Sequence, residues 1–150
     1  MTKDKVVRFT GEYRFLSNFV GGVEQQYQAA KTDIPFLAHA ILTCTDPGKA
    51  KRAGRKIKLR KDWNALQTMW NCVTAKFEMP EFKAQLLATG DKILIEGNWW
   101  HDTYWGVCTC GKCSVGILDF DSTVGGGQNM LGKLLMHLRE DLRNEVSTAK

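Results

Sequence analysis

The feature that most constrains the fold is a glycine-rich turn that leads into a leucine-rich segment near the end of the sequence. Glycines at 125–127 precede Asn129, and Gly132 lies inside the segment. Because Asn is a favoured N-cap residue, we predict a long helix whose first N–H groups are available to an anion; a capped core helix is the alternative. Gly132 predicts a close backbone approach. The apolar face of this helix is expected to comprise Leu131, Leu134, Leu135, Leu138 and Leu142.

The chain of 150 residues is long enough for one domain with its own core. Its patterns predict a single α+β domain over residues 1–150, predominantly helical with a small sheet and with its core at about 6–143. No segment resembles a signal peptide or a membrane span, so no membrane is expected. Five cysteines, an odd number, are typical of a reducing compartment and predict a cytoplasmic location.

Local signals predict the order of the elements. Asp46 and Asp62 are each expected to cap a helix, the first basic and the second reaching Phe77. Further helices are predicted at 23–31, 36–42 and 80–90, and strands at 6–9, 13–15, 92–96 and 104–107, the last two of which are expected to pair.

Basic residues are concentrated between positions 49 and 61, in a basic window that contains no acidic residue. Because lysine and arginine neutralise phosphates, the window predicts a surface for a nucleotide or a nucleic acid, and a solvated face is the alternative. Its members are Lys49, Lys51, Arg52, Arg55, Lys56, Lys58, Arg60 and Lys61.

The segment 23–31 places Glu24, Gln28 and Lys31 on a single stripe of one helix. A lysine beside an apolar wall can lose its proton and act as a nucleophile, and a neighbouring carboxylate can transfer protons. A solvated helix face is the alternative. Farther along the chain, Asp102 and Trp105 lie in a tryptophan-rich turn, which is typical either of a platform for a flat ring beside an acid or of core aromatic residues beside a loop acid.

Cys108, Cys110 and Cys113 are close enough in sequence to converge on one metal ion. This spacing predicts a structural zinc site, and free thiols in a reducing cytosol are the alternative. The fourth ligand has three candidates, His101, Cys72 and Cys44. A catalytic Cys/His pair has less support, because no spacing specifies the partner.

Seven stretches of the sequence form an ordered set: FTGEYRFLSNF (9–19), VEQQYQAAK (23–31), DPGKAKRAGRK (46–56), AKF (75–77), LLATGDKILIE (86–96), DTYWG (102–106) and GQNMLGKLLM (127–136). Together they resemble the NADAR family, also called YbiA-like N-glycosidases. The cysteine loop and the connection at 116–127 depart from the family pattern, because many relatives are shorter there.

The resemblance implies an α+β enzyme that cleaves an N-glycosidic bond at a phosphorylated ribose without a catalytic cofactor. It implies proton transfer by Glu24 and Asp102, predicted to share one pocket, and either covalent capture of the sugar by Lys31 or an electrostatic role for this lysine. The implied substrate-binding residues are Arg14, Ser17, Asn18, Phe19, Gln28, Trp105, Gly106 and Asn129.

Three functions are therefore expected in order. The first is removal of ADP-ribose from guanine bases of nucleic acid or nucleotides, which the basic window favours. The second is hydrolysis of a phosphoribosylamine intermediate of riboflavin synthesis. The third is a zinc-stabilised module that binds ADP-ribose or nucleic acid without turnover.

Overall fold

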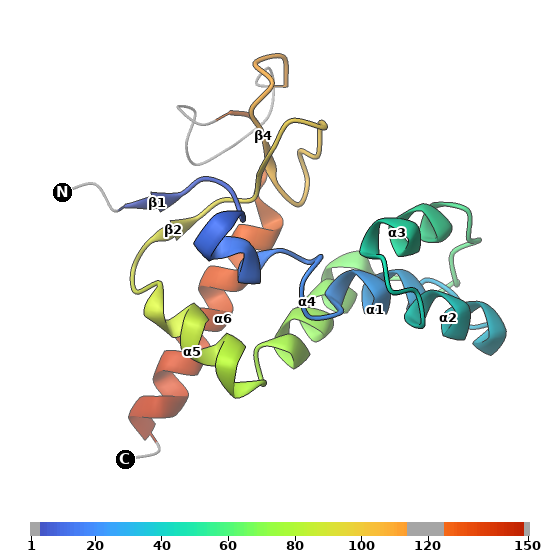
Figure 1. The fold of residues 1–150 in the computed structure, drawn as a ribbon, viewed down its shortest axis with the longest axis horizontal. Coiled ribbons are helices and arrows are strands. Elements are labelled where there is room, and N and C mark those ends of the chain that lie inside the picture. Colours follow the sequence, from blue (N-terminus) through green and yellow to red (C-terminus); the bar gives the residue numbers. More distant parts are fainter. Residues whose placement is uncertain (1–3, 114–124, 149–150) are drawn as a thin grey trace. The chain divides into compact units, whose positions relative to one another are not determined.

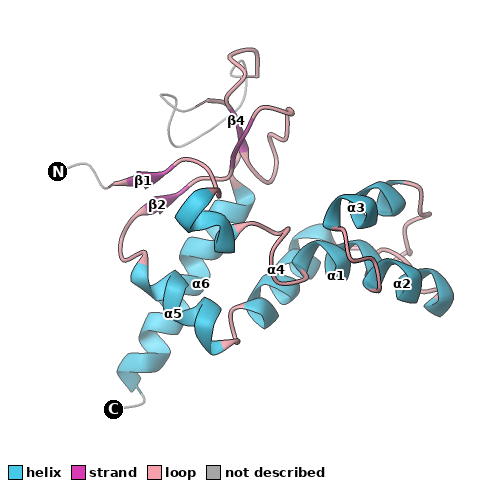
Figure 2. Cartoon of the chain, in the orientation of Figure 1, coloured by secondary structure: helices cyan, strands magenta, loops and turns pink. Residues whose placement is uncertain are grey.

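The computed structural model describes residues 4–113 and 125–148 and divides the chain into two compact units. Residues 18–82 form a helical unit, and the segments before and after them form a mixed unit. Helices account for most of the regular structure and the strands are short (Figure 2). The predicted α+β class is therefore confirmed. Whether both units act as one domain stays a prediction, and positions 116–124 of the predicted long connection lie outside the described residues.

The helical unit contains α1 (Val23–Ala29), α2 (Pro35–Leu42), α3 (Pro47–Arg55) and α4 (Ala65–Lys76). α1 packs against the other three helices of this unit, which Figure 1 shows grouped around it. Small and branched residues meet where α1, α2 and α3 come together, and the most buried are Ala29, Ile41 and Ala50. The absence of a side chain larger than a methyl at two of these positions allows the helix axes to approach closely.

The helix caps of this unit agree with the sequence at one position and differ at another. Asp46 caps α3 as predicted, because its carboxylate accepts the Gly48 N–H at 2.8 Å. The predicted cap of α4 is wrong: Asn64, not Asp62, accepts the Gln67 N–H, at 2.9 Å. Asp62 instead forms an ion pair with Arg60 at 2.6 Å. Asn and Asp are equally good caps, so only the tertiary structure decides between them.

The mixed unit contains two short parallel strand pairs. β1 (Lys5–Val6) pairs with β2 (Ile93–Leu94), and β3 (Gly97–Asn98) pairs with β4 (Val107–Cys108). The predicted strand at 13–15 is wrong, because Gly11–Leu16 forms a 3-10 helix, η1. The predicted pairing of 104–107 with 92–96 is confirmed at the ends of these segments, where the Val107 N–H donates to the Glu96 carbonyl at 2.9 Å, and the paired strands continue past both segments in a register that pairs Gly97 with Val107. α5 (Pro80–Ala88) spans the boundary between the two units in sequence.

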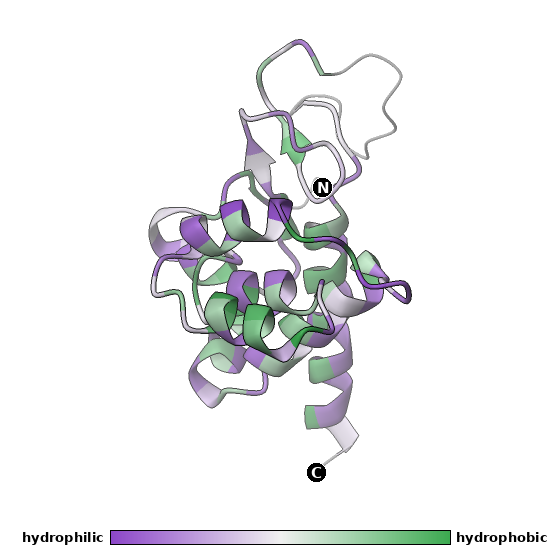
Figure 3. Cartoon of the chain, turned by 90° about the vertical axis from the view of Figure 1, so that its right-hand side faces the viewer, coloured by the Kyte–Doolittle hydropathy of each residue, from purple (hydrophilic) through white to green (hydrophobic). Residues whose placement is uncertain are grey.

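α6 (Met130–Thr148) ends the described chain and buries the predicted leucine face, of which Leu134 alone remains partly exposed. Figure 3 shows hydrophobic and hydrophilic residues on different sides of this helix. The expectation that its first N–H groups are available to an anion is wrong. The N–H groups of Asn129, Met130 and Leu131 donate to the carbonyl groups of residues 104–106 at 3.0–3.2 Å.

Asn129 fixes the start of α6 by bonding the backbone of a neighbouring segment with its side chain. Its side chain is fully buried, its Oδ1 accepts the Glu96 N–H at 3.0 Å, and its Nδ2 donates to the Leu94 carbonyl at 2.9 Å. The Leu94 carbonyl also lies against Gly132, which explains the glycine inside the helix. The predicted close backbone approach at Gly132 is therefore confirmed.

We predict that Gly132→Ala destabilises the protein although alanine favours helices. A Cβ at this position would overlap the Leu94 carbonyl and the Asn129 amide, and overpacking of this kind costs about 1–3 kcal/mol. The control is Gly48→Ala in α3, where the nearest atom to a new Cβ is the end of the Asp46 side chain at 3.2 Å. Thermal unfolding of both variants checks this, and an unchanged Tm for Gly132→Ala would contradict it.

Candidate active site

The polar stripe of α1 is buried and not solvated. Glu24 is 6% exposed and Gln28 is 4% exposed. The Gln28 Nε2 donates to the Glu24 Oε1 at 2.8 Å, so these two side chains form one buried polar pair. Because a buried carboxyl group is expensive to desolvate, a protein retains one mainly where it has a role.

The close packing of α3 on α1 explains how this pair is buried. A side chain on Gly54 of α3 would overlap Gln28, whose Cδ lies 2.6 Å from the position of such a Cβ. The Gln28 Oε1 is buried and has no hydrogen-bond partner among the described residues. A buried acceptor without a partner marks a position where a ligand or a water donates.

Three cations act on Glu24 through their charge. Burial raises the pKa of Glu24, while its hydrogen bond to Gln28 and the charges of Lys51, Lys31 and Arg55 act in the opposite direction. Two of these cations, Lys51 and Arg55, belong to the basic window. The window therefore contributes to the electrostatics of α1 and is not only a distant surface.

Lys31 lies against an aromatic wall at the end of α1. Its Nζ is 5.5 Å from the centre of the Tyr27 ring and 6.0 Å from that of Trp63, and the two rings meet edge to face. Burial lowers the pKa of Lys31, the charge of Glu24 raises it, and the charges of Arg55 and Lys51 lower it further. This environment increases the fraction of neutral amine, which is the nucleophilic form.

A second feature of the helical unit is a pocket of about 780 Å³ beside α2 and α3. Its apolar part includes Leu37, Ile41 and Ile57. Cations of the basic window line the rest: Lys49, Arg52, Arg55, Lys56 and Lys58. An apolar surface bordered by cations suits a ligand that carries both a flat ring and phosphates.

The residues around Asp102 form a separate structural feature in the mixed unit. The Asp102 carboxylate accepts the N–H groups of Tyr104 at 3.2 Å and Trp105 at 2.9 Å. The buried Asn98 side chain bonds both backbone groups of Asp102, at 2.8 and 3.0 Å. Gly106 is buried against the Glu96 carbonyl. These contacts shape the turn that supplies carbonyl groups to α6.

The structure places the predicted substrate-binding residues in both units. Asn18, Phe19 and Gln28 share the helical unit with Glu24 and Lys31; Arg14, Ser17, Asp102, Trp105, Gly106 and Asn129 belong to the mixed unit. The Asn18 carbonyl accepts the Glu24 N–H at 3.0 Å, and the exposed ring of Phe19 lies 5.9 Å from the Lys51 Nζ. Three of the predicted substrate-binding residues therefore lie in the same unit as Glu24 and Lys31. A pocket that includes Asp102 stays a prediction.

Lys76 is a candidate functional residue that the sequence analysis did not single out. It is 3% exposed, its Nζ lies 5.1 Å from the ring centres of both Phe77 and Phe82, and its aliphatic chain packs on Gly21. Burial lowers its pKa to about 7. The signal in the sequence was its position on the buried face of α4, between apolar residues at helical spacing.

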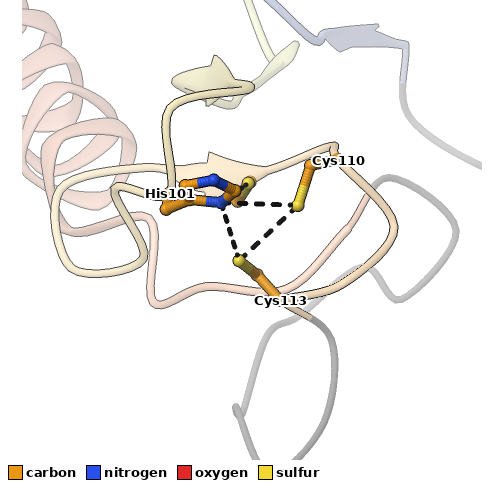
Figure 4. Close-up of side chains that lie close together, drawn as sticks. His101, Cys110 and Cys113 are labelled. Carbon is orange, nitrogen blue, oxygen red and sulfur yellow. Dashed lines mark hydrogen bonds between the residues drawn. The ribbon is translucent and has the colours of Figure 1, made fainter.

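The cysteine loop brings together a possible metal-binding cluster. His101, Cys108, Cys110 and Cys113 place one ligand atom each within 4.8 Å of all the others. Figure 4 shows the Cys110 and Cys113 sulfur atoms directed toward the His101 ring. Among the three candidates for the fourth ligand, His101 is the one that lies in this cluster. This set of ligands can hold a metal ion.

Comparison with known proteins places the chain in a family. Residues 13–143 match the family model described as the NADAR domain. The chain belongs to the NADAR domain family. The N-glycosidase Npun_R5314 of Nostoc punctiforme is 35% identical over 135 residues, which cover 83% of this chain and 76% of that protein. The N-glycosidase YbiA of Escherichia coli is 36% identical over 127 residues, with coverages of 81% and 70%.

A solved structure and a longer relative extend the comparison. The NMR structure of Escherichia coli YbiA matches with a TM-score of 0.73 and 32% identity, over 97% of this chain and 89% of that one. The riboflavin biosynthesis protein VVA0006 of Vibrio vulnificus is 34% identical over 128 residues, which are 82% of this chain but 31% of that protein. The predicted family is confirmed. The predicted enzyme class is supported as well, because Npun_R5314 and YbiA are both named N-glycosidases.

One negative finding concerns membranes. Among the helices at 4–113 and 125–148 of this NADAR protein, none is both long and apolar enough to cross a bilayer.

We predict that Lys76→Met stabilises this NADAR protein at pH 7, and that the gain shrinks toward pH 10. The Lys76 pKa is about 7 in the folded chain against an ordinary value of 10.5, so between these pH values the unfolded chain binds more protons. The stability contributed by the wild-type residue therefore rises with pH in this window. Calorimetric Tm values of both proteins across the window measure the difference. An exposed control, Lys61→Met, should show no such trend, and a difference that is constant with pH would contradict the assignment.

Proposed function

We propose that this chain is a cytoplasmic N-glycosidase that removes ADP-ribose from guanine bases of nucleic acid or nucleotides. The observation that carries the proposal is the buried Glu24–Gln28 pair, with Lys31 in the turn just after α1 and cations of the basic window beside it. The names of the relatives support the class of reaction. The basic window supports a substrate that carries phosphates.

Glu24 is the proposed general acid. Departure of a base from the anomeric carbon requires a proton on the leaving nitrogen, and burial raises the pKa of Glu24, which favours the protonated form. After transfer, the carboxylate is stabilised by the charges of Lys51, Lys31 and Arg55. The same carboxylate then accepts a proton from the water that completes the hydrolysis.

Lys31 is the proposed nucleophile. Its neutral amine attacks the anomeric carbon of the ribose, the bond from this carbon to the base nitrogen breaks, and Glu24 protonates the base. The bond to the ring oxygen then opens, the oxygen takes the proton released by the lysine nitrogen, and an imine forms. Addition of water to the imine carbon restores the amine and releases ADP-ribose. Every step uses protein groups and water, so the proposal needs no catalytic cofactor; a metal in the cysteine loop would be structural.

The pocket beside α2 and α3 supports a nucleic-acid substrate. Arg55 both lines this pocket and acts electrostatically on Glu24, so the two features adjoin within the helical unit. The apolar lining suits a nucleobase, and the cations suit neighbouring phosphates.

Two alternative functions, a different substrate and binding without turnover, can be distinguished from the proposed one in a single assay. The relative named for riboflavin biosynthesis favours a phosphoribosylamine substrate. A binding module for ADP-ribose or nucleic acid would bind without turnover. Incubation of the pure protein with an ADP-ribosylated guanine oligonucleotide and with the phosphoribosylamine distinguishes all three, because only the proposed enzyme prefers the oligonucleotide.

We predict that Lys31→Ala and Glu24→Gln each lower turnover at least about 100-fold while binding changes little. Borohydride added during turnover should reduce the imine and leave a sugar adduct on Lys31, which peptide mass spectrometry detects. Lys133→Ala on the exposed face of α6 is the matched lysine control and should retain wild-type turnover and the adduct. An active Lys31→Arg variant without any adduct would exclude the imine route.

Asp102→Asn tests the predicted second proton carrier. The amide oxygen can still accept the N–H groups of Tyr104 and Trp105, so the turn is retained and a loss of turnover reports on proton transfer. Turnover equal to the wild type would assign Asp102 to the turn alone.

We predict that replacing Lys49 and Lys56 by Gln weakens binding of an ADP-ribosylated oligonucleotide. The slope of its salt dependence should fall by about 1 for each phosphate that the protein no longer neutralises. Both side chains line the pocket, and neither is among the charges acting on Glu24. Turnover of a small ADP-ribosyl nucleoside should therefore persist. The same charge change at Lys83 and Lys133 is the control, and equal slopes for both double variants would contradict a nucleic-acid role for the window.

A further inference from the structure

The His101, Cys108, Cys110 and Cys113 cluster has the geometry of a closed four-ligand site. The His101 Nδ1 lies 3.2 Å from the Cys113 sulfur, 3.5 Å from that of Cys110 and 3.6 Å from that of Cys108, while the Cys110 and Cys113 sulfurs are 3.6 Å apart (Figure 4). Ligands at about 2.3 Å from a tetrahedral zinc ion lie slightly less than 4 Å from one another. These four distances are close to those that such an ion requires, and the Cys108 sulfur lies within 4.8 Å of the other two sulfurs.

The local backbone supports a metal rather than four independent side chains. His101 adopts a left-handed conformation with φ of 70°, which is uncommon for a residue other than glycine, and its ring lies beside the cysteine sulfurs (Figure 4). The Lys112 N–H donates to the Cys110 sulfur at 3.4 Å, and N–H donors of this kind stabilise thiolate ligands. All four ligands come from two short segments of the same turn region.

The chemistry of the ligands selects the metal. A set of three thiolates and one imidazole is typical of structural zinc, and all four positions are taken by protein atoms. Such a site leaves no position open for substrate. A disulfide is the competing state for two neighbouring cysteines, and no two cysteines of the described residues are joined by one.

The position of the cluster connects it to the start of α6. His101 and Cys108 bracket the carbonyl groups of residues 103–106, which receive the N–H groups of residues 128–131. The buried Cys108 also exchanges two backbone hydrogen bonds with Gly126, at 2.9 and 3.2 Å. A metal that joins His101 to Cys108 therefore closes the loop on which the beginning of α6 rests.

We propose that His101, Cys108, Cys110 and Cys113 bind one structural Zn²⁺ ion that holds the 101–108 loop against the N-terminus of α6. Because the folded loop holds the four ligand atoms together, zinc binds the folded chain more tightly than the unfolded one and so contributes to folding stability. This inference is independent of the proposed glycosidase activity and uses none of its residues.

Elemental analysis of the full-length protein, purified without added metal, tests the proposal. We expect about one equivalent of zinc per chain, and a Tm that falls by several degrees with a chelator and returns when Zn²⁺ alone is added back. Replacement by Co²⁺ should give the visible absorption of a tetrahedral thiolate site. Zinc near zero in protein whose thiols are all reactive, or iron in place of zinc, would overturn the proposal.

Several variants of the cluster are tested together, so that the result does not depend on the folding of any single one. Cys110→Ser and Cys113→Ser should each lose the bound zinc and the cobalt spectrum, while His101→Cys, which completes a set of four thiolates, should retain both. The matched control is Cys44→Ser in the helical unit, a partly buried cysteine outside the cluster, which should retain one zinc. Retention of full zinc content by Cys110→Ser and Cys113→Ser would assign the metal to other residues.

Discussion

The close packing of α3 against α1 at Gly54 is the contact on which the candidate active site depends. With only a hydrogen on Gly54, the Gln28 side chain fits beneath α3 and holds the Glu24 carboxyl group out of water. The same packing brings Lys51 and Arg55 near enough to act on Glu24 and Lys31. One glycine thus connects the geometry of two helices to the proton chemistry of a carboxyl group and an amine.

In the mixed unit, the amide side chains of two asparagines join separate backbone segments. Asn129 joins the strand region at 94–96 to the start of α6, and Asn98 bonds both backbone groups of Asp102. Both amides are buried, where satisfied hydrogen bonds specify a unique arrangement. The proposed zinc ion would act on the same loop, so α6 would be supported from two sides of one turn.

Local features of the sequence were sufficient to predict those parts of the structure that one short segment determines. The spacing of Glu24 and Gln28 predicted their shared face of α1, which ends before Lys31, and Asp46 before a proline predicted the cap of α3. Burial of Glu24 was beyond local reasoning, because it depends on Gly54 thirty residues away. The choice of His101 over Cys72 and Cys44 also required the fold. The occupied N–H groups of α6 were missed for the same reason, since their acceptors lie more than twenty residues upstream.

The reaction proposed for the Glu24, Gln28 and Lys31 cluster cleaves the bond from ribose to a base nitrogen. The most direct test is mass spectrometry of the products formed from an ADP-ribosylated guanine oligonucleotide in ¹⁸O-labelled water. We predict an oligonucleotide with an intact, unmodified guanine and free ADP-ribose that carries the label at its anomeric carbon. Label in a released phosphate, or an oligonucleotide that keeps a ribose fragment on guanine, would show that another bond is cleaved and would exclude the proposed reaction.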